Sequence, residues 1–143
     1  MLGLGEAKRE LPREFRGELP AGVARAEVFC AGCLVLEGKS ETEDPEQAAR
    51  LAKDPKLANW PLVVLHDDAG VARSVPDFLW STWTRFEPAS DIYAAETEVV
   101  RHHLAYSAPV VIDARTKPGF PKELIVRDDI AALVDRRWGE YFP

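Results

Sequence analysis

The run Leu62–Leu65 constrains the fold of this chain more than any other segment. Four consecutive apolar residues without polar alternation are typical of a strand whose two faces are both buried, as in sheets covered by helices on each side. Pro61 precedes the run, and His66, Asp67 and Asp68 follow it. The segment therefore predicts a central strand that ends in polar residues at one edge of a covered sheet.

Helices are predicted on both sides of this strand in the sequence. The segments Asp44–Gln47 and Ser74–Asp77 each have the pattern of a capping box, in which the first side chain accepts from free backbone amides. Asp128 is a third candidate N-cap. Apolar segments at residues 26–36 and 110–112 supply further strands. The alternation predicts an α/β domain with three layers, α/β/α.

Length and charge limit the class of protein. A chain of 143 residues, 46% of them hydrophobic, fits one domain, which we place at residues 26–143, after a Gly- and Pro-containing arm at residues 1–25 that should gain order only against another surface. The net charge of -6, without a basic cluster, disfavours a nucleic-acid partner. No apolar run approaches the roughly 18 residues of a membrane span, and the first residues lack a signal-peptide pattern. These features predict a cytoplasmic protein.

Large apolar side chains recur at helical spacing in two segments. Within the helix that starts near Ser74, a stripe predicted to face inward contains Val75, Leu79, Trp83 and Phe86. Trp80 falls off this stripe, which makes it a candidate interface residue, because Trp is enriched at interface anchors. The closing helix should bury Ile130, Leu133, Val134 and Trp138 and end at Gly139.

Cys30 and Cys33 have the spacing of a redox pair or of half a zinc site. The sequence offers no second Cys pair, and the motif lies inside an apolar run rather than at a helix start. Free cysteines are often small buried residues. We therefore predict that both are buried in a strand.

Asp67 and Asp68 lie where open α/β sheets tend to place ligand sites, and two carboxylates suit Mg²⁺ or acid-base chemistry. Adjacent residues at a strand end point apart, however, which favours a structural role. In that role they accept from backbone amides and pair with Arg73 or Arg85. Arg85 and Asp91 are expected to fasten the turn around Pro88 in the same manner.

His102 and His103 lie in a segment of mixed character. Either imidazole suits a proton carrier or a contact to a carboxylate substrate, although solvated surface histidines are more common. The sequence has no Gly-rich phosphate loop and no G-x-S-x-G motif. It therefore predicts no catalytic, cofactor-binding or metal site of its own.

Two blocks of this sequence resemble the C-terminal domain of UbiD-type decarboxylases, including the 4-hydroxybenzoate decarboxylase and phenylphosphate carboxylase branches. One block comprises 62–68, 78–88 and 91–93, and the other is Pro109–Pro118, which resembles the last strand of that domain. The resemblance extends over roughly residues 26–138. It implies an α/β fold.

The family resemblance also implies a cofactor and a partner. UbiD-type enzymes use prenylated FMN with divalent metal ions, held with the catalytic residues in domains that precede this one. The C-terminal domain supplies oligomer contacts and apolar side chains at the substrate end of the pocket. By position, the segment after Tyr93 should approach the pocket, which makes His102, His103, Leu104 and Tyr106 candidates; the last two are equally suited to the core.

The first hypothesis is therefore a small subunit, or an excised C-terminal domain, of a prenylated-FMN-dependent enzyme that decarboxylates or carboxylates aromatic or unsaturated acids. A larger partner would carry the cofactor and the catalytic residues. The alternative is a free-standing scaffold or regulatory module with the same fold and no catalysis. A third possibility, a redox protein built on the two cysteines, is disfavoured by their strand context.

Overall fold

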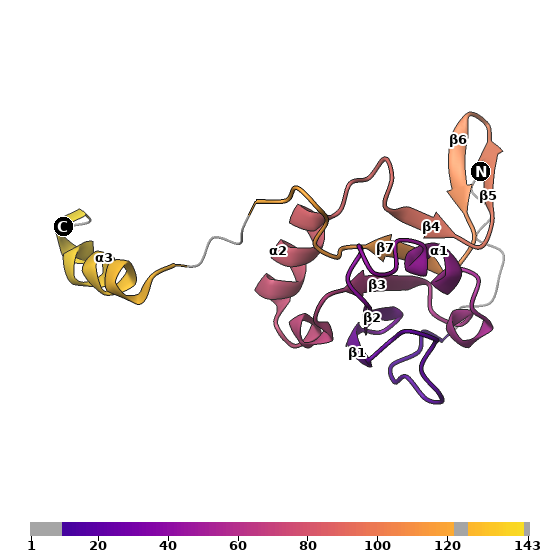
Figure 1. Ribbon diagram of the computed structural model, residues 1–143, viewed down its shortest axis with the longest axis horizontal. Helices are drawn as coiled ribbons and strands as arrows, with labels where there is room; N and C mark the ends of the chain where they lie inside the picture. Colours follow the sequence, from indigo (N-terminus) through magenta and orange to yellow (C-terminus); the bar gives the residue numbers. More distant parts are fainter. Residues whose placement is uncertain (1–9, 122–125, 142–143) are drawn as a thin grey trace.

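The structure, a computed structural model, describes residues 10–121 and 126–141 and is built on a five-stranded sheet (Figure 1). The strand order is β1-β2-β3-β7-β4; β2, β3 and β7 run parallel, whereas β1 and β4 pair antiparallel at the edges. The strands are β1 (Arg25–Cys30), β2 (Cys33–Glu37), β3 (Leu62–His66), β4 (Ile92–Ala94) and β7 (Val110–Asp113). The central strand expected from the apolar run is confirmed as β3.

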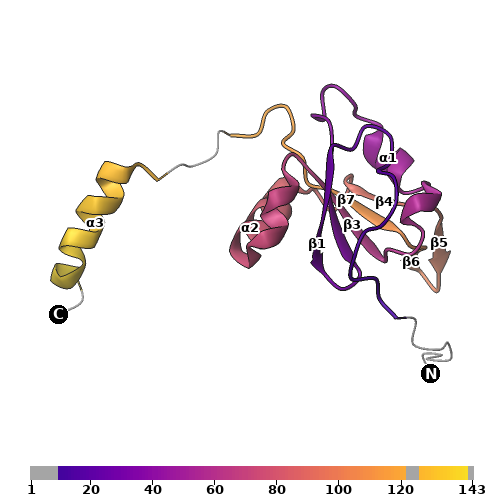
Figure 2. The same cartoon turned by 90° about the horizontal axis from the view of Figure 1, so that it is seen from below.

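Helical segments cover both faces of the sheet (Figure 2). The helix α1 (Gln47–Leu51) and the 3₁₀ turn η1 (Pro55–Leu57) pack on one face, and the 3₁₀ turn η2 (Ala69–Arg73) and the helix α2 (Val75–Arg85) pack on the other. The first core contains Leu34, Leu36, Leu51, Leu57, Trp60, Val63, Leu65 and Val111, and the second contains Cys33, Val35, Val64, Ala69, Phe78 and Ala114. Consecutive residues of a strand thus pack into the cores on opposite faces of the sheet. The prediction of a three-layer α/β/α domain is confirmed.

The single strand predicted over residues 26–36 is wrong, because the chain turns at Ala31 and Gly32 and forms the antiparallel pair β1 and β2. Gly32 has φ +84°, a conformation that favours glycine. The turn leaves Cys30 exposed and Cys33 buried, so the prediction that both cysteines are buried is also wrong for Cys30. The sequence did not predict this turn because a single glycine, Gly32, is its only marker within the apolar segment 26–36.

The described part of the N-terminal arm packs on the domain itself. Phe15 lies with its ring centroid 6.5 Å from that of Trp60, and Val23 packs against the same core. The amide of Gly32 donates to the carbonyl of Pro12 at 2.8 Å. Residues 10–24 are therefore ordered by their own domain, contrary to expectation, and residues 1–9 of the predicted arm lie outside the described residues.

The three predicted capping sites behave differently, and Asp128 is the first residue of α3 (Asp128–Tyr141) rather than its N-cap. Ser74 caps α2 by accepting from the amide of Asp77 at 3.4 Å. The predicted cap Asp44 does not cap α1, which begins only at Gln47 and has no side-chain cap. The carboxylate of Asp44 instead accepts from Arg50.

The face of α2 that was predicted to be buried is its outer face. Val75, Leu79 and Trp83 are 57%, 45% and 51% exposed, and Phe86 is partly exposed. The residues of α2 that face the sheet are Phe78, Ser81 and Thr82. Two of these are small, which lets the helix lie close to the sheet, and the larger apolar side chains are left outside. Trp80 is outside as well, at 69% exposed.

The remaining elements extend from the sheet. Strands β5 (Thr97–Val100) and β6 (His103–Tyr106) form a separate hairpin, and α3 (Asp128–Tyr141) lies apart from the sheet in both views (Figures 1 and 2). The predicted inward face of α3 is exposed, and Gly139 lies inside the helix rather than ending it. None of the described helices is long and apolar enough to cross a membrane.

Candidate functional site

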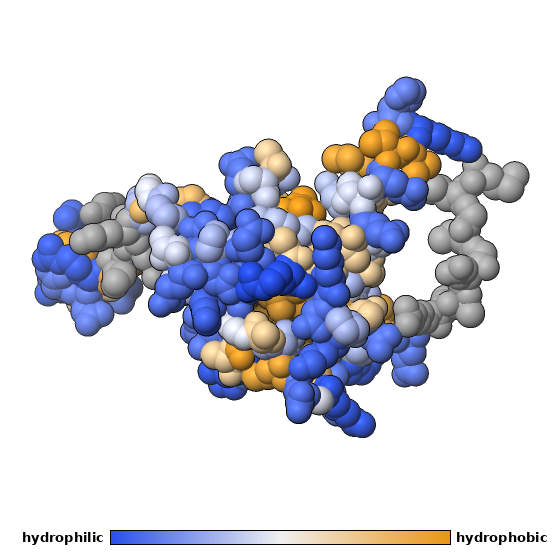
Figure 3. Space-filling view, turned by 45° about the vertical axis from the view of Figure 1, so that its right-hand side comes forward, coloured by the Kyte–Doolittle hydropathy of each residue, from blue (hydrophilic) through white to orange (hydrophobic). Residues whose placement is uncertain are grey.

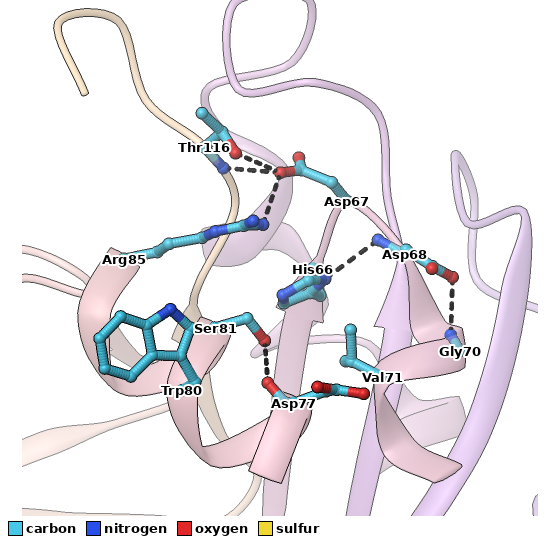
Figure 4. Close-up of a pocket in the computed structure, with 10 residues that line it drawn as sticks. All are labelled: His66, Asp67, Asp68, Gly70, Val71, Asp77, Trp80, Ser81, Arg85 and Thr116. Carbon is cyan, nitrogen blue, oxygen red and sulfur yellow. Dashed lines mark hydrogen bonds and ion pairs between the residues drawn. The ribbon is translucent and has the colours of Figure 1, made fainter. Parts of the chain in front are cut away.

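A cavity of about 470 Å³ opens at the carboxyl end of β3 (Figure 4). At this edge of the sheet the central strand is followed by polar residues, as the sequence predicted. The strand, the following turn and α2 provide most of its wall, and the segment after β7 closes it. The lining residues are His66, Asp67, Asp68, Gly70, Val71, Asp77, Trp80, Ser81, Arg85 and Thr116.

His66 is the most unusual group in this cavity because it is only 2% exposed. Its Nδ1 accepts from the backbone amide of Asp68 at 3.0 Å, which places the proton of the neutral ring on Nε2. Among the described residues Nε2 has no hydrogen-bond partner, and in Figure 4 it faces the side of α2. Burial, reinforced by the charge of Arg85, lowers the pKa of His66. The site therefore offers one neutral N–H donor.

Asp67 joins three segments at the rim of the cavity. Its Oδ2 accepts from the backbone amide and the hydroxyl of Thr116 at 2.8 and 2.7 Å, and it lies 3.3 Å from the guanidinium of Arg85 (Figure 4). These contacts tie the end of β3 to the end of α2 and to the segment after β7. The carboxylate is thus engaged in holding the edge together.

Asp68 points away from Asp67 and serves a different contact. Its Oδ1 accepts from the amide of Gly70 at 2.7 Å and pairs with Arg25 of β1. Arg73, the other expected partner, pairs with Glu27 instead. The two adjacent acids therefore do not form a catalytic pair, and the structural alternative describes their contacts better.

Asp91 fastens the turn after α2 together with Lys117. Its carboxylate accepts from the amide of Glu87 at 2.7 Å and lies 2.9 Å from Nζ of Lys117. The same ammonium donates to the carbonyls of Arg85 and Asp113 at 3.1 and 2.9 Å. Lys117 thus links Asp91 to the end of α2 and to the end of β7.

Arg115 is a buried structural group that the sequence analysis missed. It is 0% exposed and donates to both oxygens of Asp113, at 2.9 and 2.6 Å. It also donates to the carbonyls of Lys39 and Asp44, at 3.0 and 2.9 Å. Burial opposes the charge, but the hydrogen bonds to Asp113 outweigh it and raise the pKa of Arg115. An Asp-x-Arg pattern directly after a buried strand was the available signal.

The four substrate-pocket candidates do not lie at this cavity. His102, His103, Leu104 and Tyr106 belong to the β5–β6 hairpin, at the far end of the sheet from α2 (Figure 1). Leu104 and Tyr106 are 62% and 39% exposed, so neither is a core residue. The pocket role of all four residues stays a prediction.

The hairpin carries an apolar face with little support beneath it. Val99 and Leu104 are opposite one another across the two strands and are 70% and 62% exposed. Figure 3 shows apolar surface gathered over this projecting hairpin. Its turn residues, Arg101 and His102, have φ of 50° and 68°, values that non-glycine residues rarely adopt. A two-stranded hairpin is marginally stable in water unless it packs on another surface.

The described residues contain no cluster of metal ligands, and one thiol has a strongly shifted pKa. Among residues 10–121 and 126–141, no three His, Cys, Asp or Glu side chains come together as a metal site. Burial raises the pKa of the Cys33 thiol to about 12, which disfavours the thiolate that redox chemistry needs.

No family model matches the sequence, but individual relatives do. The chain is 40% identical over 143 residues to a protein of Chlamydia pneumoniae that is named as a subunit of 4-hydroxybenzoate decarboxylase. This relative confirms the resemblance to the UbiD-type decarboxylases. An uncharacterized protein of Chlamydia trachomatis serovar D is also 40% identical. The chain spans only 24% of the length of each of these two relatives.

The solved structures similar to this one include the vanillic acid decarboxylase of Sedimentibacter hydroxybenzoicus in open form. The match has 16% sequence identity and a TM-score of 0.48, and it covers 84% of this chain and 29% of the other.

Proposed function

We propose that this chain is a non-catalytic part of a UbiD-type decarboxylase for aromatic or unsaturated carboxylic acids, with hydroxybenzoates as the first class to test. A larger partner, as a separate subunit or as further sequence of a longer protein, would bind prenylated FMN and a divalent metal. That cofactor would supply the exchange of a carboxylate for a proton. The 40% identity to a protein named as a decarboxylase subunit supports the proposal.

The observation that carries the proposal is the unsupported apolar face of the β5–β6 hairpin. Val99, Leu104 and Tyr106 lie on it, and the strained turn at Arg101 and His102 forms its tip. Backbone strain of this kind costs on the order of 1–3 kcal/mol per residue and tends to occur at functional sites. We infer that the hairpin docks on the cofactor-binding partner, where its apolar side chains would exclude water from the substrate.

The test is co-expression of the tagged chain with the remaining segments of a longer relative. We expect the two to copurify, and the pair, but not this chain by itself, to show flavin absorbance and to release CO₂ from 4-hydroxybenzoate. A chain that stays separate from the partner would refute the proposal and favour the free-standing scaffold. Flavin absorbance in the isolated chain would also refute the proposal, because it would show that this chain binds the cofactor by itself.

A matched pair of substitutions tests the hairpin specifically. Val99→Ser should weaken copurification at least tenfold, because Val99 lies on the docking face and is 70% exposed. Val126→Ser is the control, since Val126 is 71% exposed but lies outside the hairpin. Both variants should melt like the parent. Equal copurification of the two variants would remove the hairpin from the interface.

A further inference from the structure

The turn between β1 and β2 brings Cys30 and Cys33 together. They are paired residues of two antiparallel strands, and only Ala31 and Gly32 separate them in the chain. Directly opposed residues of an antiparallel pair have Cα atoms roughly 4.5–5.5 Å apart, and disulfides span Cα separations of about 4.4–6.8 Å. Such residues also project from the same face of the sheet. The backbone thus places the two thiols where a disulfide can join them.

A β-bulge at Phe29 creates this pairing. The register of the two strands shifts after Val28, and Cys30 rather than Phe29 is therefore opposite Cys33. The extra residue, Phe29, stacks on Phe78 of α2 with ring centroids 3.8 Å apart, a contact that holds the bulge in place. Bulges re-aim side chains in this way and are common beside functional positions. Without the extra residue, an aromatic side chain would be opposite the buried thiol.

The rest of the turn is fixed by neighbouring segments. The amide of Gly32 donates to the carbonyl of Pro12 at 2.8 Å, and the carbonyl of Gly32 accepts from the amide of Leu62 at 3.1 Å. Leu11 packs so closely on the turn that a Cβ at Gly32 would lie 3.2 Å from its Cδ2. The N-terminal arm and β3 therefore hold the turn between them, and the two thiols stay adjacent without rearrangement of the backbone.

The two thiols differ in their access to solvent. Cys30 is exposed, whereas Cys33 is buried, with 5% of its surface exposed. Burial raises the pKa of Cys33 to about 12, and Cys30 contributes to this shift through its charge and a side-chain hydrogen bond. A reagent in solution therefore meets Cys30 first, while Cys33 can reach the sulfur of Cys30 from inside the fold.

We propose that Cys30 and Cys33 form a reversible disulfide by exchange with a low-molecular-weight disulfide. The thiolate of Cys30 attacks one sulfur of that molecule, forms a mixed disulfide and releases one small thiol. Cys33 then loses its proton, attacks the sulfur of Cys30 and releases the second small thiol. The two cysteines are oxidised, and the small disulfide is reduced to two thiols that carry away the two protons.

The hairpin removes the objection that the sequence raised against thiol chemistry, because the two cysteines do not lie within one strand. The high pKa of Cys33 remains and makes the second step the slow one. The part of that shift that comes from the charge of Cys30 is lost once Cys30 is joined to the small thiol. The inference does not depend on the proposed decarboxylase function, because it uses only β1, β2 and the segments packed on their turn.

Oxidised glutathione tests the proposal on the reduced, full-length chain. Samples taken over time are blocked with N-ethylmaleimide and weighed by mass spectrometry without reduction. We expect the parent to pass through a glutathione adduct and to end as a single chain that has lost two hydrogens and takes up no maleimide. A glutathione adduct that persists in the parent, or a disulfide between two chains, would overturn the proposal.

Single substitutions test the role of each thiol. Cys33→Ala should retain the glutathione adduct on Cys30, because no second thiol displaces it. Cys30→Ala should react with glutathione at least tenfold more slowly than Cys33→Ala while it is folded, because its remaining thiol is buried. Alanine is chosen because it adds no hydroxyl to the buried position. Equal rates for the two folded variants would contradict the assignment of Cys30 as the thiol that reacts first.

A comparison of the folded and unfolded chain tests whether the structure positions the thiols. The equilibrium constant for disulfide formation, measured against glutathione, should be at least tenfold larger in the folded protein than in urea. By linkage, the oxidised protein should then unfold at a higher urea concentration than the reduced protein. Equal constants in the two states would show that the pair behaves as any unstructured Cys-x-x-Cys segment, and would refute the inference.

Discussion

Replacement of Arg115 by methionine should strongly destabilise the protein. Arg115 is fully buried and is bonded to Asp113, itself 2% exposed, and to the carbonyls of Lys39 and Asp44. Methionine keeps most of the volume but leaves the carboxylate buried without its counterion. Breaking a buried pair in this way costs about 3–5 kcal/mol. Because small domains have about 5–15 kcal/mol in total, Arg115→Met should lose roughly a fifth of the stability or more.

Urea unfolding followed by tryptophan fluorescence measures this loss. The midpoint should fall while the slope with denaturant stays constant, since the same surface is exposed on unfolding. Arg16→Met is the control, because Arg16 pairs with Glu14 in a largely exposed contact and should give no measurable change.

A double substitution separates the buried charge from the lost packing. Asp113→Leu with Arg115→Met removes both charges, so it should recover part of the stability that Arg115→Met loses. A loss below about 1 kcal/mol in the single variant, or no recovery in the double variant, would refute the argument that an uncompensated carboxylate dominates the cost.

Three further predictions concern titration, thiol reactivity and the cavity rim. His66, whose pKa is lowered by burial, should make stability fall as the pH drops below about 6.5, because the unfolded chain binds a proton that the folded chain does not; His66→Gln should flatten this part of the pH profile. Iodoacetamide at pH 8 should label exposed Cys30 in the folded protein and buried Cys33 only after unfolding; equal rates would contradict the burial argument. Arg85→Ala should lower the free energy of unfolding by on the order of 1–3 kcal/mol, because Asp67 loses its counterion. An unchanged melting temperature with an inactive assembled enzyme would instead make Arg85 a site residue.

The layers of the fold follow from the sequence because each depends on a short local pattern. The unbroken run Leu62–Leu65 indicates burial on both faces, and Ser74 marks the start of α2 correctly. The turn between β1 and β2 does not follow, since one glycine in an apolar run is compatible with both a strand and a hairpin. The late start of α1 at Gln47 does not follow either, because the capping-box pattern at 44–47 predicts an earlier one.

The orientation of α2 could not be predicted from hydrophobicity by itself. The largest apolar side chains of a helix mark its buried face only when the opposing surface has room for them. Here Phe78 stacks on Phe29 of β1 with ring centroids 3.8 Å apart, and the small side chains of Ser81 and Thr82 lie between helix and sheet. That close approach leaves Leu79 and Trp83 outside.

The candidate site was predicted in part. The sequence placed polar groups at the end of β3, and the structure brings Asp67 and Arg85 together there. Two features depend on segments that are distant in the sequence: the burial of His66, whose Nε2 has no partner within the described part of the chain, and the bridge formed by Lys117. Only the folded sheet brings those segments to one edge.

Substitutions at the two ends of the sheet should have different effects, on folding stability at one end and on partner binding at the other. At the carboxyl edge, Arg115 and Lys117 bond to several loops, so substitution there should unfold the domain before any partner is affected. At the other end, the hairpin that contains Val99 has few contacts to lose, so substitution there should leave the fold intact and affect only binding. Because the two kinds of variant fail in different assays, a loss of decarboxylation caused by Val99→Ser in a protein that melts normally would be evidence for an interface rather than for a damaged fold.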